Sequence, residues 1–124
     1  MQIDRIDLIN TLRIRRTGLW RLDPTTRYAG SMYYRTDENN SQLIFSILAS
    51  KIVVHAFKGP NQGSFDVEID GQNIGTFSLE DNDATELYEA LIPIISNLTS
   101  ELHIVKFITN SNPIIIDSIY GILE

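Results

Sequence analysis

The two histidines are the first candidates for catalytic chemistry in this sequence. Nucleophilic catalysis needs a nucleophile, a base and a third group that orients the base. His55 and His103 both lie in apolar stretches rich in β-forming residues, and the sequence has no G-x-S-x-G nucleophile elbow. A histidine inside a strand is more often packed in the fold than used as a base, so the pattern does not indicate a hydrolase.

Acidic side chains occur in two patterns that bear on chemistry. The acids of residues 64–70 alternate along one expected strand and share its solvated face, whereas glycosidases place two carboxylates across a cleft. Residues 80–86 hold four acids, of which Asp81 and Asp83 are candidate calcium ligands. The D-x-D-x-D-G framework is absent, and a solvated turn is the alternative. We expect no cofactor, with a structural calcium ion at this loop as the one exception to test.

Aromatic residues near amide and guanidinium groups suggest a different chemistry, the binding of sugars. The CH groups of a pyranose stack on an aromatic ring, and neighbouring polar side chains bond its hydroxyl groups. The candidate glycan-binding residues are Trp20, Tyr34, Arg35, Asn39 and Asn40. For each aromatic residue the alternative is a place in the core or at the edge of the fold, because large aromatic side chains are usually mostly buried.

The elements that must position these residues are strands, since the apolar pattern has a period of two. Strands are expected at residues 28–36, 42–48, 51–57, 65–69, 74–79, 86–92, 102–109 and 114–123. Several short strands separated by turn signals predict a β-sandwich or a barrel. Residues 1–14 have apolar residues at mixed spacings and fit a short helix or a strand about equally well.

The stretch GPNQGSFDVEIDGQNIGTFSL, residues 59–79, lacks the G-K-[ST] of a phosphate loop, and no helix follows it. It resembles the central hairpin of jelly-roll β-sandwiches in the galactose-binding-domain-like group. Trp20 with the Y-A-G of residues 28–30, and LHIVKFITNSNPIIIDSI near the end, are similar to the group's opening and closing strands. Glu101 stands where the group usually has glycine. The resemblance implies an antiparallel jelly-roll β-sandwich of about eight strands and a structural role for His103.

Charge is unevenly distributed along the chain. Residues 1–35 hold seven Arg, no Lys and three Asp, a net charge of +4, although the whole chain carries −6. The overall negative charge argues against binding to nucleic acid. No apolar run approaches the roughly 20 residues of a membrane span, and the N-terminus does not have the pattern of a signal peptide. We therefore expect no nucleic-acid or membrane partner, and the localisation stays open.

These patterns predict an N-terminal arm over residues 1–17 and a β-sandwich domain over residues 18–124. The arm residues Arg5, Arg13, Arg15 and Arg16 are candidates to dock on an acidic surface, of a neighbouring subunit or of the same domain. The favoured expectation is a non-catalytic structural subunit of a larger assembly, such as the capsid decoration, tail or baseplate of a phage virion. The alternative is a carbohydrate-binding module. An enzyme is a distant third.

Overall fold

The computed structural model describes residues 1–9, 12–23 and 33–124, and within these ranges it contains strands and turns but no helix. No segment of the described chain is therefore a helix that could cross a membrane. The strands are β1 (Gln2–Asp7), β2 (Arg15–Thr17), β3 (Trp20–Asp23), β4 (Tyr33–Thr36), β5 (Gln42–Ala49), β6 (Lys51–Lys58), β7 (Ser64–Ile69), β8 (Gln72–Ser78), β9 (Tyr88–Ile95), β10 (Glu101–Ser111) and β11 (Ile114–Leu123).

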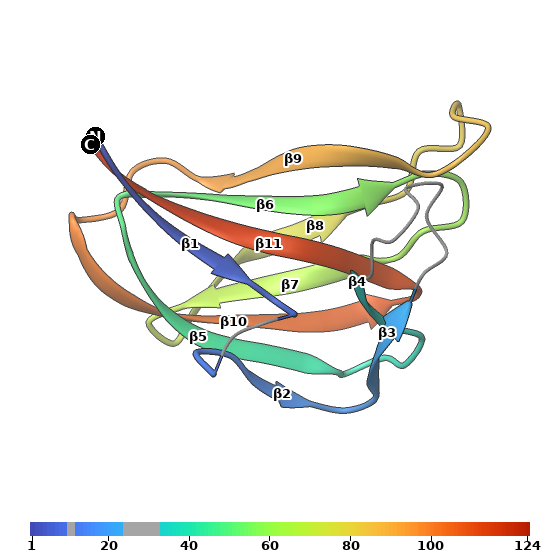
Figure 1. The fold of residues 1–124 in the computed structure, drawn as a ribbon, viewed down its shortest axis with the longest axis horizontal. Coiled ribbons are helices and arrows are strands. Elements are labelled where there is room, and N and C mark those ends of the chain that lie inside the picture. Colours follow the sequence, from blue (N-terminus) through green and yellow to red (C-terminus); the bar gives the residue numbers. More distant parts are fainter. Residues whose placement is uncertain (10–11, 24–32) are drawn as a thin grey trace.

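Two antiparallel sheets pack against each other to form a sandwich (Figure 1). The six-stranded sheet has the order β3-β4-β11-β6-β9, and β1 also pairs with β11; the five-stranded sheet has the order β2-β5-β10-β7-β8. Strands β4 and β1 lie end to end along the same edge of β11, β4 beside residues 114–116 and β1 beside residues 118–123. The predicted antiparallel jelly-roll sandwich is confirmed, with more strands than the eight or so expected.

The core lies between the sheets and follows from the alternation in the sequence. In β7, Phe65, Val67 and Ile69 are buried, while the acids between them lie on the outer face. Phe107 packs edge-on against Phe45, with ring centroids 5.3 Å apart, and tilted against Phe65 at 5.1 Å. Such aromatic pairs add specific geometry to the hydrophobic burial that holds the two sheets together.

Two glycines of the stretch 59–79 are required by the backbone. Gly71 has a φ of +83° and follows Asp70 at +53°, so this pair makes the tight turn between β7 and β8. Gly63 packs directly on the backbone carbonyl of Ser111, where a Cβ would collide with it. A glycine in a turn was the expectation from the sequence and holds at Gly71, whereas the close packing of Gly63 is seen only in the structure.

Strand β9 extends through Pro93 to Ile95, three residues beyond the predicted end at residue 92, and it begins two residues later than predicted. A proline interrupts a strand only where its missing N–H would be needed for pairing. Strand β9 is the edge of the six-stranded sheet and pairs with β6 alone, so Pro93 can lie opposite Val53 with its nitrogen on the free side.

Residues 1–17, expected as a separate arm, contribute a strand to each sheet. Strand β1 pairs with β11 along its whole length, and β2 pairs with residues 42–44 of β5. Ile6, Leu8 and Ile14 are buried in the same core cluster as the other strands. The mixed apolar spacing in this segment thus belongs to one strand and to the loop that crosses from one sheet to the other.

The ion pair between Asp4 and Arg13 lies where β1 of one sheet approaches β5 of the other. The two guanidinium nitrogens of Arg13 donate to the two carboxylate oxygens of Asp4 at 2.6 and 2.8 Å, and one also donates to the carbonyl of Ser46 at 2.9 Å. Asp4 accepts a further bond from the N–H of Leu48. The hydrogen bonds from Arg13 lower the pKa of Asp4 below its ordinary value. Because Asp4 is on β1 and Leu48 on β5, the pair links the two sheets.

We expect Asp4→Asn to lower the free energy of unfolding by about 1 kcal/mol, because it removes a charge-assisted, partly screened contact between sheets. The folded-state pKa of Asp4 lies below its unfolded value, so this stabilisation is present above about pH 4 and is lost as the pH falls through the folded pKa. Urea unfolding at pH 7 and pH 3 measures both effects.

Asp7→Asn is the matched control, since the Arg5–Asp7 pair lies within one strand with both side chains about half exposed. It should change the unfolding free energy by less than about 0.5 kcal/mol. Equal effects of the two substitutions at pH 7 would show that the Asp4–Arg13 pair does not link the sheets energetically.

Candidate functional site

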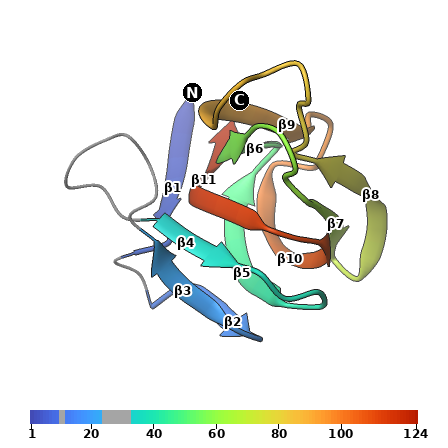
Figure 2. The same ribbon diagram turned by 90° about the vertical axis from the view of Figure 1, so that its right-hand side faces the viewer.

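Four segments meet at one end of the sandwich, beside the start of β3. They are the β4–β5 turn, the end of β10, the β6–β7 loop and the β10–β11 loop. The turn from β4 to β5 contacts the end of β10, where the N–H of Asn40 donates to the carbonyl of Thr109 at 2.8 Å. The loop from β6 to β7 joins the β10–β11 loop, where Gly63 donates to the carbonyl of Pro113 at 2.8 Å. Figure 2 shows β3 and β4 at the edge of the molecule next to this end.

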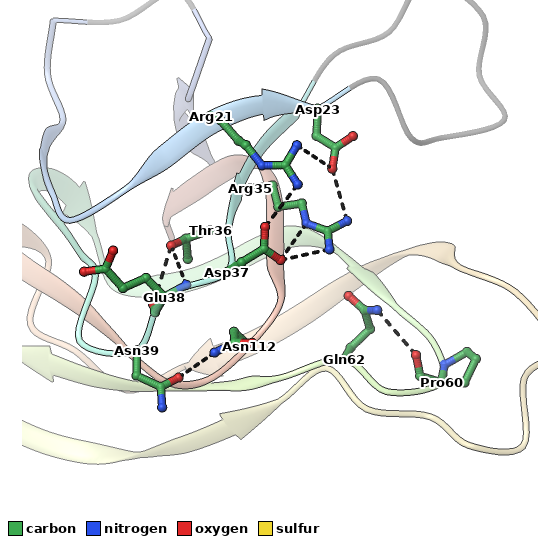
Figure 3. Close-up of polar contacts among 10 residues, drawn as sticks. All are labelled: Arg21, Asp23, Arg35, Thr36, Asp37, Glu38, Asn39, Pro60, Gln62 and Asn112. Atoms are coloured by element: carbon green, nitrogen blue, oxygen red, sulfur yellow. Dashed lines mark hydrogen bonds and ion pairs between the residues drawn. The ribbon is translucent and has the colours of Figure 1, made fainter.

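A network of two arginines and two aspartates lies on the β3–β4 hairpin (Figure 3). Antiparallel pairing places Arg21 directly opposite Arg35. Arg35 donates two hydrogen bonds to Asp37, at 2.9 and 3.0 Å, and one to the buried carboxylate of Asp23, at 3.1 Å. Arg21 donates to Asp37 at 3.0 Å and lies 3.7 Å from Asp23. Each carboxylate therefore lies between the two guanidinium groups.

The network fixes the charge state of its exposed carboxylate. Hydrogen bonds from Arg35, and then from Arg21, lower the pKa of Asp37 below its ordinary value. Asp37 thus stays ionised at any physiological pH. The guanidinium of Arg35 is held by both aspartates at once, which restricts its rotamers and makes this part of the surface rigid before any ligand arrives.

A cavity of about 520 Å³ opens beside this network, and we name it the loop-end cavity. Its lining residues are Leu19, Trp20, Arg21, Asp37 and Glu38. The indole N–H of Trp20 donates to the carbonyl of Thr17 at 3.0 Å, so the ring is held in place by a bond at its edge. The lining of the cavity combines apolar residues, Leu19 and Trp20, with the charged hydrogen-bonding residues Arg21, Asp37 and Glu38.

Two of the five predicted glycan-binding residues thus lie at this site, Trp20 in the wall and Arg35 in the network behind it. Tyr34 is partly buried, and the guanidinium of Arg16 lies over its ring, 4.3 Å from the centroid. Asn39 is exposed and accepts a hydrogen bond from Asn112 at 2.9 Å. Asn40 has a φ of +64°, so it serves the β4–β5 turn. Their roles in binding stay predictions.

Sequence reasoning missed three of the lining residues, Arg21, Asp37 and Glu38. Only the pairing of β3 with β4 brings Arg21 beside Arg35, and β3 was not expected as a strand because it has four residues. The signal in the sequence was the close spacing of Arg, Asp and Glu in residues 35–38, directly after an aromatic strand.

One buried polar atom faces the same end of the molecule without a partner. Oε1 of Gln62 has no hydrogen bond within the described residues, while its Nε2 donates to the carbonyl of Pro60 at 3.4 Å. Figure 3 shows Gln62 below the Arg35–Asp37 pair. A buried acceptor without a partner costs free energy, so a water molecule or a ligand hydroxyl would be stabilised there.

Three of the four arginines predicted to serve assembly make contacts within their own domain. Arg13 holds the ion pair between the sheets, and Arg16 covers an aromatic ring and donates to a backbone carbonyl. Arg5 lies 5.4 Å from the ring centroid of Tyr120. Arg15 is exposed on the edge strand β2. Docking on the same domain was one of the two possibilities left open, and docking on a neighbouring subunit stays a prediction.

His103 is buried and structural. Its Nε2 lies 2.7 Å from the carbonyl oxygen of Thr99, and its Nδ1 lies 2.7 Å from a carboxylate oxygen of Asp70. A carbonyl and an ionised carboxylate can only accept, so these two contacts favour the protonated ring, in which both nitrogens donate. Burial opposes this charge, but the bonds to Thr99 and Asp70 raise the pKa of His103 above its ordinary value. The ring joins the β7–β8 turn to the start of β10.

His55 lies on the outer face of the six-stranded sheet. Its Nδ1 is 3.0 Å from a carboxylate oxygen of Asp117, and its Nε2 is 3.6 Å from one of Glu89. The neighbouring hydroxyl of Ser118 donates to Asp117 rather than to the histidine. This group therefore does not have the nucleophile–base contact of a hydrolytic triad.

The loop predicted to bind calcium is held by its own hydrogen bonds. Oδ1 of Asp81 accepts from the N–H of Asp83 at 3.1 Å, and Oδ2 accepts from the hydroxyl of Tyr88 at 2.6 Å. The hydroxyl of Tyr88 is the main cause of the lowered pKa of Asp81. In the described parts of the chain, no three His, Asp or Glu side chains gather as a metal site would require. Calcium binding by Asp81 and Asp83 stays a prediction.

No family model and no curated protein matches the sequence, but several solved structures are similar to this chain. A native family 35 carbohydrate binding module from Clostridium thermocellum superposes with a TM-score of 0.66 at 13% identity, covering 97% of each chain. The CBM35 of Cellvibrio japonicus Abf62 gives 0.66 at 18% identity, covering 99% of this chain and 96% of that one. The chain has a galactose-binding-like jelly-roll fold.

Larger proteins contain the same sandwich as one part. A two-domain esterase active on acetylated mannans, co-crystallised with mannopentaose, superposes with a TM-score of 0.76 at 13% identity. The match covers 99% of this chain and 37% of the esterase, so the chain spans little more than a third of that protein's length.

We expect the stability of the protein to fall as the pH rises above about 6.5, because the folded-state pKa of His103 is raised above its unfolded value. The contribution is fully present below pH 6.5 and is lost as the pH passes the folded pKa. Urea unfolding between pH 5.5 and pH 9 measures the slope, and the NMR titration of the His103 ring gives its pKa directly. Asp70→Asn should weaken the slope, and a ring that titrates at or below its ordinary value would contradict the assignment.

The calcium prediction has its own test in thermal unfolding. An ion held by Asp81 and Asp83 binds the folded state and should raise Tm in calcium chloride relative to EDTA. Asp83→Asn should then remove the difference. Identical Tm values in calcium and in EDTA would end the prediction.

Proposed function

We propose that this protein is a non-catalytic carbohydrate-binding module that holds a glycan in the loop-end cavity. The observation that carries the proposal is the composition of this cavity, whose lining includes Trp20 together with Arg21, Asp37 and Glu38. A pyranose has apolar CH faces and polar hydroxyl edges, and this combination of an aromatic wall with fixed donors and acceptors is complementary to it.

The rigidity of the site supports the same function. Ordering side chains around a ligand costs about 0.5–1.5 kcal/mol for each flexible side chain that binding immobilises. Here the ion pairs to Asp23 and Asp37 already hold Arg35, and the indole hydrogen bond holds Trp20. A sugar would therefore meet groups that are largely ordered in advance.

The comparisons support sugar binding because similar structures include carbohydrate-binding modules. Two of the structures that cover nearly the whole of both chains are carbohydrate-binding modules, and they match at 13% and 18% identity. At this identity the likeness establishes the fold, and the cavity supplies the functional argument. The match covers only 37% of the two-domain esterase, so we do not extend its activity to this chain.

The assembly function expected from the sequence is not the one we propose. Its main support was an arginine-rich arm free to reach a neighbour, and Arg5, Arg13 and Arg16 instead contact residues of their own domain. None of the three similar structures described above is a virion protein. A role in a phage particle thus rests on the charge pattern of the sequence alone.

Trp20→Ala is expected to weaken glycan binding at least tenfold, because it removes the stacking surface of the cavity. A glycan array identifies the ligand, with mannopentaose and cellohexaose among the probes, and isothermal titration calorimetry measures Kd. Because Trp20 also packs against the core, thermal unfolding must show that the variant is folded.

Leu22→Ala is the matched control, since Leu22 lies on the same strand, is 42% exposed and does not line the cavity. It should leave Kd unchanged. An array without any hit at millimolar sugar would overturn the proposed function, and a folded Trp20→Ala protein with unchanged Kd would place the binding site elsewhere.

A further inference from the structure

The charges around the loop-end cavity do not balance. Arg21, Asp37 and Glu38 line the cavity. Arg35 and Asp23 do not line it but are bonded to these residues in the ion-pair network. With every group ionised, this set of described residues has one negative charge in excess. The whole chain adds to this local excess, since its net charge is −6.

Both positive charges are already compensated within the protein. Arg35 is bonded by Asp23 and Asp37, and Arg21 is bonded by Asp37 at 3.0 Å with Asp23 at 3.7 Å. An anionic ligand that sought a guanidinium partner here would have to compete with Asp37, whose ionised form the two arginines stabilise. Neither arginine is thus available as a free cation.

The negative charge in excess belongs to Glu38. Its backbone is fixed, because its N–H donates to the hydroxyl oxygen of Thr36 at 3.2 Å and its carbonyl accepts from Thr109 at 2.8 Å. Its exposed carboxylate has no hydrogen bond or ion pair to any described residue. The carboxylate at the cavity wall therefore has both oxygens free to accept bonds from a ligand.

We propose that the loop-end cavity selects neutral sugars and rejects uronates and sulfated sugars, with Glu38 as the residue that determines this specificity. The inference rests on the proposed glycan-binding function. The carboxylate of Glu38 accepts hydrogen bonds from two neighbouring hydroxyl groups of a neutral pyranose. A carboxylate or sulfate on the sugar instead meets a like charge, and the described residues that line the cavity offer no cation without an ion pair of its own. The repulsion is greatest at low ionic strength.

The experiment compares oligosaccharides that share a backbone and differ only in charge. The probes are cellohexaose and mannopentaose, each paired with the same oligosaccharide after oxidation of its hydroxymethyl groups to carboxylates. For the backbone that binds, we expect Kd of the full chain to be at least about tenfold weaker for the oxidised form in 20 mM salt, and the ratio to shrink in 0.5 M salt.

Glu38→Gln should reduce the ratio of the two Kd values by at least about threefold, since it removes the excess charge and keeps an acceptor. Glu101→Gln is the control, because it makes the same change in net charge at the opposite end of β10. It should leave the ratio unaltered. Equal or tighter binding of the oxidised form, or a ratio that Glu38→Gln does not change, would overturn the inference and leave the proposed function standing. No binding of any oligosaccharide, neutral or oxidised, would overturn both.

Discussion

The pairing of β4 with the first residues of β11 attaches the candidate site to the rest of the molecule. Strand β3 pairs only with β4, and β4 joins the large sheet through residues 34–36 opposite residues 114–116 of β11. The three β11 residues, Ile114, Ile115 and Ile116, are fully buried. The position of Trp20 and of the arginine–aspartate network is thus set by three rows of backbone pairing next to a fully buried part of the core, although the site itself is at an exposed edge.

The same structure resolves the uneven charge of the sequence. The N-terminal part of the chain is strongly basic, which along the sequence looks like a surface meant for an acidic partner. In space, most of these arginines meet aspartates that are only a few residues or one strand away, as in the pairs of Arg13 with Asp4 and of Arg35 with Asp23. Much of the charge that is segregated along the sequence is thus compensated in the fold, and the described residues around the loop-end cavity keep one negative charge.

Most of the sandwich could be predicted because its central strands follow local rules. The alternation of residues 65–69, the β-branched runs that became β5 and β6, and the turn at Asp70–Gly71 each depend on neighbouring residues alone. The first three strands could not be predicted in this way. Strands β2 and β3 have three and four residues, and β1 has a mixed apolar pattern, so their conformation comes from the strands they pair with.

The candidate site was predicted in part for the same reason. Trp20 and Arg35 could be chosen by residue type, because indole rings and guanidinium groups are suited to sugars. Arg21 and Asp37 are functional candidates only through the register of β3 with β4, and register is a property of two segments together. Tyr34 had the right chemistry, but Arg16, eighteen residues earlier in the chain, lies over its ring.

The two chain termini lie side by side, with Gln2 opposite Leu123 in the pairing of β1 with β11 (Figure 1). Strand β11 has ten residues, so the termini and the loop-end cavity are separated by roughly 30 Å along the long axis of the sandwich. Neighbouring termini make the domain suitable for insertion into another protein. A host protein could receive it within a surface loop, through two short connections at one point, and the cavity would face away from the host. Joining the present ends and reopening the chain in another loop would likewise keep every strand pair intact.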